Sequence, residues 1–454
     1  MQNPNYETWR RRGAALQETM QHQLQLIQAG DTVERQPTLL ALLSALQAFG
    51  QSQLDFFIDG FGVDANVRLE PSTDYPPEYA MRATVDQIAY DLDVIQRAYQ
   101  QRLPSQSTEA MRTTLAKADI LAYRALQPAI NAGLIENTTV VTYFQKAVNV
   151  RIIPYAPVAF IGLPLSALAV SRDLLAIPHE VGHYVFRNGK AQTGQYAGSR
   201  FAAALDRELS GLPAWCRAWL EEIFADVYGA VVGGPVMALG FEDLLTDDRI
   251  TEFTHDDGEH PVAALRPDVY YEVFAQQADH QTEAALLEKR WQAQFDLRGA
   301  PTDFTPAGGA AVQLTDAKAV IAKAIAIILN GDLGQLQVDR ALWSGSLTDE
   351  ADPAALYDYF DGVVEELANS SATQVPDIEV TVDREGQPCA LQLAALDKGY
   401  GTPVSRQIGE TGLWLDAVKG QANHFNMPPQ VWMALLDGSG WAVEGPGGVI
   451  SHGK

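Results

Sequence analysis

The stretch His179-Glu180-Val181-Gly182-His183 constrains this chain more than any other part of the sequence. On a helix, two histidines four residues apart leave the same face, so both imidazoles can converge on one metal ion. Glu180 lies about 100° around the helix from His179. There it can take a proton from a metal-bound water without being a ligand itself. The stretch therefore predicts a metal-binding helix, with Zn2+ as the expected metal.

The residues around this motif favour a buried helix over a surface helix with two solvated histidines. Pro178 comes before the motif, and three apolar residues follow it directly. A buried histidine without a partner is costly, and a metal ion removes that cost. We expect the helix to span residues 171–187, with Ser171 as its N-cap and Asn188-Gly189 as its stop signal.

The composition supports a globular chain and excludes two classes of partner. Its 454 residues allow two or three domains, and a hydrophobic fraction of 47% supports a sizeable core. The net charge of −25 and the pI near 4.6 argue against nucleic-acid binding and against docking on anionic membranes.

Cysteine content and hydropathy predict the compartment. Cys216 and Cys389 are the only cysteines, too few for a disulfide framework, which favours a reducing compartment. The N-terminal residues contain no apolar segment of the kind that secretory signals have. The most apolar run, residues 155–170, is interrupted by two prolines and is too short to span a bilayer. We expect a soluble, cytoplasmic protein without an integral membrane segment.

Hydrophobic periodicity predicts helices first and strands later. Helices are expected over residues 7–29, 38–57, 81–99 and 108–133. Runs of β-branched residues then predict strands over residues 138–144, 148–153 and 158–163. The strand just before the metal-binding helix is expected to offer its edge to an extended substrate.

The rest of the chain is expected to be helical over residues 268–295, 315–329 and 353–369. Beyond residue 370, alternating segments and many glycines predict a small β-rich domain with Trp414, Trp432 and Trp441. His424 and His452 lack ligand-like spacing and are expected at the surface. The fold class is thus α+β and mainly helical, divided into residues 1–135, 136–370 and 371–454.

A second buried helix, expected over residues 213–232, carries the remaining ligand. Zinc held by two histidines needs one more protein ligand besides water. Glu222 and Asp226 are four residues apart, so both leave one face of an otherwise apolar segment. Glu222 on the metal and Asp226 on the outer ring nitrogen of His179 give both carboxylates a partner and fix the tautomer.

Two other residues compete with Glu222 as the third ligand. Glu221 points about 100° away around the helix and is expected to meet solvent. The thiolate of Cys216 can bind zinc, but it shares no spacing pattern with the two histidines. The predicted ligands are therefore His179, His183 and Glu222.

The two motifs together resemble those of the gluzincin metallopeptidases. His179-Glu180-x-x-His183 is followed by Glu222-x-x-x-Asp226, and the segment Glu-Glu-Ile-Phe-Ala-Asp is similar to the glutamate-helix signature of that family. The resemblance implies a zincin-like catalytic core, in which a short β-sheet accompanies the HExxH helix and the glutamate helix.

A third element narrows the resemblance. His260-Pro261, followed by Arg266, is similar to the His-Pro…Arg segment of the CAAX prenyl protease and heat-shock protease branch. In that branch the histidine and the arginine line the cleft and assist the oxyanion or hold the glutamate ligand. The resemblance covers about residues 150–275, and soluble minimal gluzincins are the better comparison because no membrane-spanning segment is expected.

The resemblance implies a zinc metallopeptidase that hydrolyses a peptide or protein substrate. Zinc lowers the pKa of its bound water, and Glu180 acts as general base. His260, together with Arg266, is the implied second donor to the oxyanion. Tyr184 and Tyr228 are alternative donors.

Two other functions stay open, a zinc-braced binding or scaffold protein and a zinc hydrolase of a non-peptide amide. Structural zinc sites are usually closed by four ligands, mostly Cys, whereas this chain has few Cys and carries Glu180. The acidic residues 242–259 are expected to form a solvated loop. A calcium site or a rim for basic substrates is the alternative, although EF-hand spacing is lacking.

Overall fold

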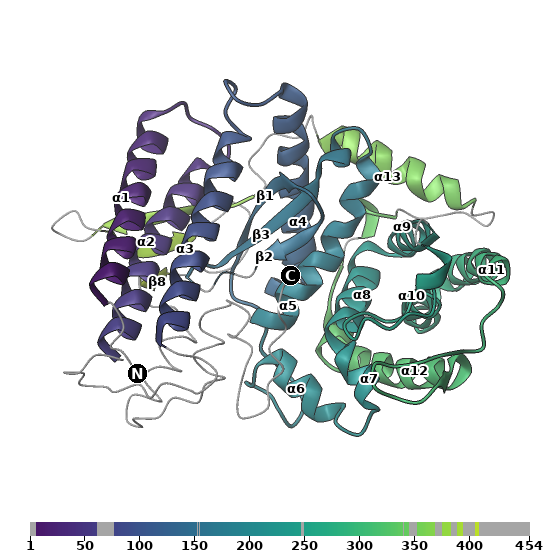
Figure 1. Cartoon of the computed structure of the whole chain (residues 1–454). Coiled ribbons are helices and arrows are strands. Elements are labelled where there is room, and N and C mark those ends of the chain that lie inside the picture. Colours follow the sequence, from purple (N-terminus) through teal and green to yellow (C-terminus); the bar gives the residue numbers. More distant parts are fainter. Residues whose placement is uncertain are drawn as a thin grey trace.

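The computed structural model describes most of the chain up to residue 367 and short stretches beyond it. The described residues are 6–60, 77–151, 153, 155–246, 249–338, 340–344, 352–367, 375–382, 388–393 and 405–407. Helices dominate these residues, and the strands form small sheets (Figure 1). The prediction of a mainly helical α+β fold is therefore confirmed.

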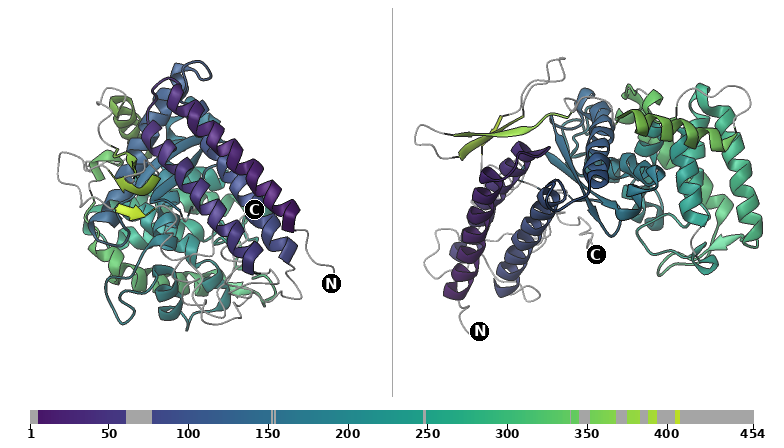
Figure 2. Two further views of the ribbon diagram at one scale, coloured as in Figure 1. Left: turned by 90° about the vertical axis from the view of Figure 1, so that its left-hand side faces the viewer. Right: turned by 90° about the horizontal axis from the view of Figure 1, so that it is seen from above.

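Three long helices lie side by side at one end of the molecule (Figures 1 and 2). They are α1 (Tyr6–Ala29), α2 (Gln36–Gly60) and α3 (Pro77–Gln100), close to the bounds that periodicity predicts. The expected apolar stripes form their shared core, including Leu39, Leu42, Leu46, Phe49, Met81, Ile88 and Ile95. The loop expected between α2 and α3 lies outside the described residues.

The fourth helix, α4 (Glu109–Asn131), belongs to a different part of the molecule. Thr108 caps its start, because Thr108 Oγ1 accepts a hydrogen bond of 3.2 Å from the backbone N–H of Met111. Pro128 lies inside its last turn. The helix packs on the central sheet and on α5 (Ile177–Asn188) rather than with α1–α3.

The central sheet contains β1 (Thr139–Gln145), β2 (Asn149–Arg151) and β3 (Val158–Pro164) in the order β1-β3-β2. β1 runs parallel to β3, and β2 runs antiparallel to it. β3 precedes the metal-binding helix but has a neighbour on both sides. The expectation that β3 offers an edge to a substrate is therefore wrong over residues 160–162, where β2 pairs with the second side of β3.

The sheet separates two hydrophobic cores, because successive side chains of a strand point to opposite faces. Val141, Tyr143 and Phe160 face α1–α3. Val140 and Ile161 face α4 and the helices that follow the sheet. Figure 2 shows these two sets of helices on either side of the strands.

The remaining helices form the other end of the molecule (Figure 1). They are α5, α6 (Phe201–Glu208), α7 (Ala214–Ala218), α8 (Leu220–Gly233), α9 (Pro235–Thr246), α10 (Arg266–Ala275), α11 (Gln281–Leu297), α12 (Leu314–Asn330) and α13 (Pro353–Leu367). The helical segments expected here are present, with that over residues 268–295 split into α10 and α11. No helix of the described residues combines the length and apolar character needed to cross a membrane.

Two predicted helices differ from the structure in detail. Residues 171–176 form a 3-10 helix, η2 (Ser171–Ala176), and the α-helix begins only at Ile177. Ser171 is not an N-cap, because its hydroxyl donates to Asp361 of α13 instead. The second buried helix is interrupted at Trp219, which separates α7 from α8. The predicted stop at Asn188-Gly189 is confirmed.

The last described strands form an antiparallel sheet of β6 (Ile378–Val382), β7 (Pro388–Leu393) and β8 (Ser405–Gln407). Buried Arg35 connects this part to β1, since it donates to Val140 O and to Pro376 O. Of the region beyond residue 370, which was predicted to be β-rich, the structure describes only these strands and residues 375–377. Trp414, Trp432, Trp441, His424 and His452 lie outside the described residues.

Candidate metal centre

The centre is built where α5 and α8 pack against each other. Gly182, inside the HExxH motif, allows this close approach, because a Cβ at that position would lie 2.8 Å from the Cα of Ala225. Any larger residue would push the two helices apart. The close approach of α5 and α8 therefore brings His179 of α5 and Glu222 of α8 to the same place.

Three predicted ligand residues converge there. Nε2 of His179 lies 3.0 Å from Nε2 of His183. The Glu222 carboxylate lies 3.5 Å from the first nitrogen and 3.3 Å from the second. Tetrahedral zinc with bonds of about 2.0–2.1 Å separates neighbouring ligand atoms by roughly 3.3 Å. The three side chains therefore form a group that could hold a metal ion.

The outer ring nitrogens of both histidines face carboxylates. Nδ1 of His179 lies 2.9 Å from Asp226 Oδ1, although its N–H is not well aligned with that oxygen. Nδ1 of His183 lies 3.1 Å from Glu221 Oε1. A carboxylate holds the proton on the nitrogen that it faces, so the lone pairs of both Nε2 atoms point into the cluster.

The cluster consequently requires positive charge at its middle. Two lone pairs and the Glu222 carboxylate face one another and repel unless a cation lies between them. Burial lowers the pKa of His179, but Asp226 and Glu222 outweigh burial and raise it to about 10. A proton thus takes the place of the cation in the free protein, and a metal ion would displace it.

Arg266 and Tyr270 of α10 hold the carboxylates from behind. Arg266 donates to Glu222 Oε2 at 2.8 Å and to Asp226 Oδ2 at 2.9 Å. The Tyr270 hydroxyl donates to Asp226 Oδ1 at 3.1 Å. Of the two roles that the family resemblance implies for Arg266, this position fits that of holding the glutamate. Tyr270 was missed, although it lies four residues after Arg266 on the same helical face.

Glu221 is only partly exposed to solvent and is paired with other side chains, which the sequence did not lead us to expect. Its side chain is 25% exposed and accepts two hydrogen bonds of 2.7 Å from Arg187. Burial opposes ionisation of Glu221, but His183 and Arg187 together keep its pKa below the ordinary value. The sequence contained a signal for this pair, because Arg187 lies four residues after His183 on α5.

Glu180 is almost fully buried, with 9% of its surface exposed. Within the described part of the chain it makes no hydrogen bond or ion pair. Neither carboxylate oxygen of Glu180 is among the fully buried unpaired atoms, so the carboxylate can still meet water. The other carboxylates around the centre, Glu221, Glu222 and Asp226, are all paired.

His260 reaches the centre from the loop before α10. Its Nε2 lies 3.5 Å from Glu222 Oε1, and its Nδ1 lies 2.7 Å from Asp257 Oδ2. Asp257 Oδ1 also accepts the backbone N–H groups of Glu259 and His260, which fixes the turn. The side chain of His260 is 41% exposed, so it is accessible to a bound substrate.

The acidic residues 242–259 form a solvated loop only in part, since Asp257 and Glu259 are exposed in a loop whereas other carboxylates of the segment are buried or paired. Glu242 lies in α9, is fully buried, and accepts hydrogen bonds from Tyr271 and Arg290. Asp256 accepts from the Trp219 indole at 2.9 Å and from a backbone N–H at residue 307. These carboxylates join helices and loops, which a charge run in the sequence does not reveal. Residues 247–248 lie outside the described residues.

Three residues considered from the sequence lie apart from the chemistry. The Tyr228 hydroxyl is buried and donates to Ala125 O at 2.7 Å, so it cannot donate to a substrate. Tyr184 is buried as well. Burial raises the pKa of the Cys216 thiol to about 12. Cys216 is also absent from the group of ligand atoms around Glu222.

The position of Asp226 predicts a graded effect on metal affinity. The variant Asp226→Asn is expected to bind zinc roughly 10–100-fold more weakly, because it loses the charge that orients His179 and pairs with Arg266. Competition with a chelator of known affinity measures the change. Asp206→Asn, at an exposed position of α6, is the matched control. An affinity equal to wild type would remove Asp226 from the site.

The chain was compared with family models, curated proteins and solved structures, and none of these comparisons gave a match. The geometry of the centre is therefore the basis for inferring a function.

Proposed function

We propose that the chain is a zinc-dependent peptidase of the gluzincin type. The observation that carries the proposal is the meeting of His179, His183 and Glu222 beside Glu180, a mostly buried residue whose carboxylate makes no hydrogen bond or ion pair with the described residues. Three protein ligands leave one position open for water or substrate, as in catalytic zinc sites.

Each residue of the centre has its own role in the proposed reaction. When bound, zinc supplies a Lewis acid that makes water a nucleophile near neutral pH. Glu180 accepts the proton of the attacking water and returns it to the leaving amine. His260 donates to the oxyanion that forms at the peptide carbonyl. Arg266 orients Glu222 and balances its charge.

The geometry favours catalysis over the zinc-braced scaffold. A zinc-braced scaffold closes its site with a fourth protein ligand, whereas the described residues supply three in this group. Glu180 would also have no task in a scaffold. Hydrolysis of a non-peptide amide uses the same chemistry, so the choice of substrate decides between that alternative and a peptidase.

The proposal has further parts: the zincin-like core follows from the family resemblance, and the β-rich domain follows from the alternating sequence pattern beyond residue 370. We assign a zincin-like core to the sheet of β1–β3 with α5 and α8, and a small β-rich domain to residues 371–454. A cytoplasmic location with a peptide or protein substrate fits the low cysteine content and the charge of −25.

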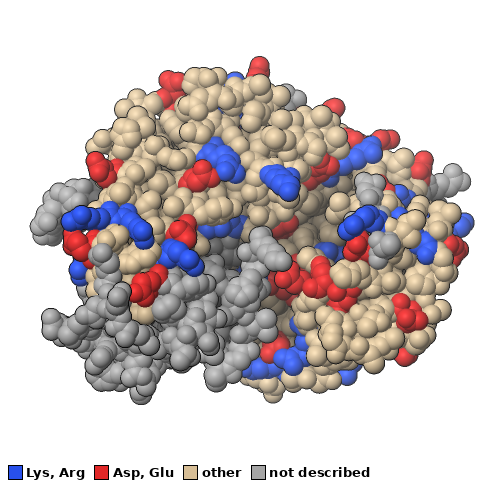
Figure 3. Space-filling model, in the orientation of Figure 1, with Lys and Arg blue, Asp and Glu red and all other residues tan. Residues whose placement is uncertain are grey.

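The acidic surface favours basic substrates. Figure 3 shows Asp and Glu side chains gathered right of centre, over the region where Figure 1 places α5 and α8. The two arginines closest to the ligands, Arg187 and Arg266, are both paired with carboxylates. Peptides with Lys or Arg near the cleaved bond should therefore bind better than acidic ones.

The test combines metal analysis with a peptide library. Purified protein should contain one zinc per chain, and cleavage of a diverse library should stop on chelation and return when zinc is restored. Cleavage of non-peptide amides alone would favour the second alternative. Stoichiometric zinc without hydrolysis of any amide would favour the scaffold.

A further inference from the structure

Tyr270 of α10 is fully buried and lies behind the metal centre. Its hydroxyl donates a hydrogen bond of 3.1 Å to Asp226 Oδ1. That oxygen also lies 2.9 Å from Nδ1 of His179, so Tyr270 and His179 share one acceptor atom. Burial raises the pKa of Tyr270 well above its usual range, and the charge of Asp226 adds to this effect. The hydroxyl therefore keeps its proton and acts as a donor.

The position of the Asp226 carboxylate decides how His179 is held. Nδ1 of His179 is fully buried and has no well-aligned hydrogen-bond partner among the described residues. Asp226 Oδ1 is the acceptor beside it, and a small rotation of the carboxylate would change that contact. The outer contact of a histidine fixes the direction of its ring and of the nitrogen that it offers to a metal. A group that fixes Asp226 therefore also fixes His179.

Arg266 fixes Asp226 only in part, because it serves two carboxylates. Its Nε donates to Asp226 Oδ2 at 2.9 Å. Its Nη2 lies 2.8 Å from Glu222 Oε2 and 3.2 Å from Asp226 Oδ1, so it is closer to Glu222. The hydrogen bond from Tyr270 goes to Oδ1 and thus secures the oxygen that faces His179.

The ring of Tyr270 is itself held by an aromatic contact. Phe241 of α9 lies 5.3 Å from Tyr270 and 5.4 Å from His179, measured between ring centroids. The guanidinium carbon of Arg266 lies 4.6 Å from the centroid of the Phe241 ring. Phe241 is thus packed against three side chains of the centre and leaves them little room to move.

We propose that Tyr270 is a positioning residue of the metal centre, which holds Asp226 Oδ1 in place so that His179 presents its Nε2 atom to zinc. The proposal rests on the zinc site put forward above. It adds α10 to the chain of contacts that runs from Tyr270 through Asp226 to His179. The Tyr270 hydroxyl takes no part in the reaction itself, since it is buried behind the ligands.

Zinc affinity of the full-length protein, measured by competition with a chelator, tests the proposal. Tyr270→Phe removes the hydroxyl and keeps the ring against Phe241. It acts one residue further from the metal than a direct partner of a ligand, so it is expected to weaken zinc binding by roughly 3–10-fold. In Asp226→Asn the carboxylate through which Tyr270 acts is already lost, and adding Tyr270→Phe should weaken zinc binding no further.

A second variant covers the case in which Tyr270→Phe does not fold. Phe241→Leu frees the rings of Tyr270 and His179 and removes no hydrogen-bonding group. It should also weaken zinc binding. Thermal unfolding shows which of the variants are folded.

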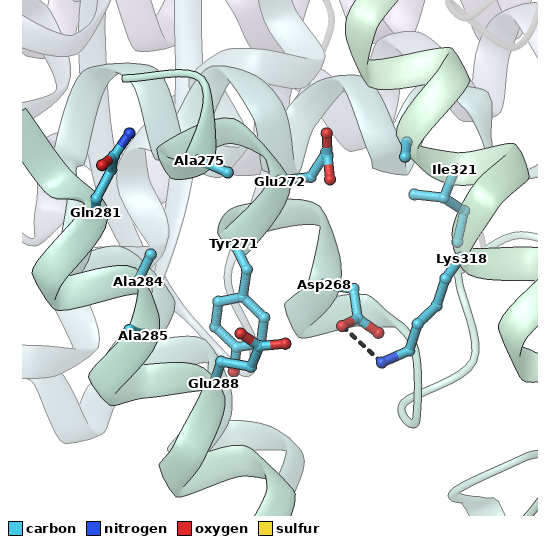
Figure 4. Close-up of a pocket in the computed structure, with 11 residues that line it drawn as sticks. Asp268, Tyr271, Glu272, Ala275, Gln281, Ala284, Ala285, Glu288, Lys318 and Ile321 are labelled. Atoms are coloured by element: carbon cyan, nitrogen blue, oxygen red, sulfur yellow. Dashed lines mark hydrogen bonds and ion pairs between the residues drawn. The ribbon is translucent and has the colours of Figure 1, made fainter. Parts of the chain in front are cut away.

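Tyr271→Phe is the matched control. Tyr271 is the next residue of α10, is also buried, and its hydroxyl also donates to a buried carboxylate, that of Glu242. It lies about 100° further round the helix and lines the groove between α10, α11 and α12 (Figure 4). The control should lose stability as Tyr270→Phe does, but it should keep the wild-type zinc affinity.

Equal weakening of zinc binding in Tyr270→Phe and Tyr271→Phe would show a general effect of stability and would overturn the proposal. It would also be overturned if folded Tyr270→Phe and Phe241→Leu bound zinc as tightly as wild type or more tightly. A further loss of affinity on adding Tyr270→Phe to Asp226→Asn would show that Tyr270 does not act through Asp226. A wild-type protein that binds no zinc would overturn the zinc site, and this proposal with it.

Discussion

The Glu180→Gln protein is expected to hold zinc at wild-type stoichiometry and to cleave peptides at least roughly 10²–10⁴-fold more slowly. The substitution keeps the size of the side chain and leaves the three ligands unchanged. It removes the group that accepts the proton of water and returns it to the amine, so one change affects two steps. Because Glu180 makes no hydrogen bond or ion pair with the described residues, its loss should not weaken the fold.

The measurements are kcat/KM on a peptide that wild type cleaves, zinc content, and thermal unfolding. Glu259→Gln is the matched control, since Glu259 is exposed on the loop that carries His260. That control should retain wild-type kinetics. His260→Ala should lose less rate than Glu180→Gln and keep its zinc, because it acts only in the transition state. Wild-type kinetics in Glu180→Gln would show that Glu180 is not the general base.

The sequence predicted the parts of the site that depend on one helix at a time. His179 and His183 share a helical face because they are four residues apart, and the same holds for Glu222 and Asp226 on α8. This spacing rule holds for any single helix, so it can be applied without knowing the fold. The most direct structural agreement is the 2.9 Å separation between His179 and Asp226, which joins the two helices as expected.

Contacts between helices were harder to predict, because they depend on packing. The pairing of Glu221 with Arg187 requires α5 and α8 to meet at a known distance, which Gly182 sets. The periodicity of α8 alone placed Glu221 towards solvent. Tyr270 reaches Asp226 only because α10 crosses behind α8. The sequence contained these residues at suitable spacings but no indication of which helices would touch.

The order of the strands could not be read from their sequences. β1, β2 and β3 all appear as short apolar or β-branched runs, and such runs do not reveal which strand lies in the middle. The structure places β3 between β1 and β2. On that side of β3 the outer strand of the sheet is therefore β2, and its residues 149–151 are partly exposed. A substrate that binds by strand addition would pair with β2 there.

The variants His179→Ala, His183→Ala and Glu222→Ala are each expected to lose stoichiometric zinc. Their ligand atoms lie 3.0–3.5 Å apart around one point, and loss of any one leaves two ligands for a metal that takes at least three from a protein. In wild type, zinc at a concentration 100 times its dissociation constant should stabilise the folded state by about 2.7 kcal/mol. The unfolding temperature should rise accordingly. This increase should be absent from the three variants.

Glu221→Ala is the discriminating control for this last result, because Glu221 is adjacent to Glu222 and equally acidic. It contacts the outer nitrogen of His183 and not the ligand cluster, so the variant should keep one zinc per chain with affinity reduced by roughly 10–100-fold. Zinc analysis after gel filtration, with chelator competition, separates weakened binding from loss. Loss of zinc from Glu221→Ala together with its retention in Glu222→Ala would show that the ligand is Glu221 and that α8 presents the other face to the metal.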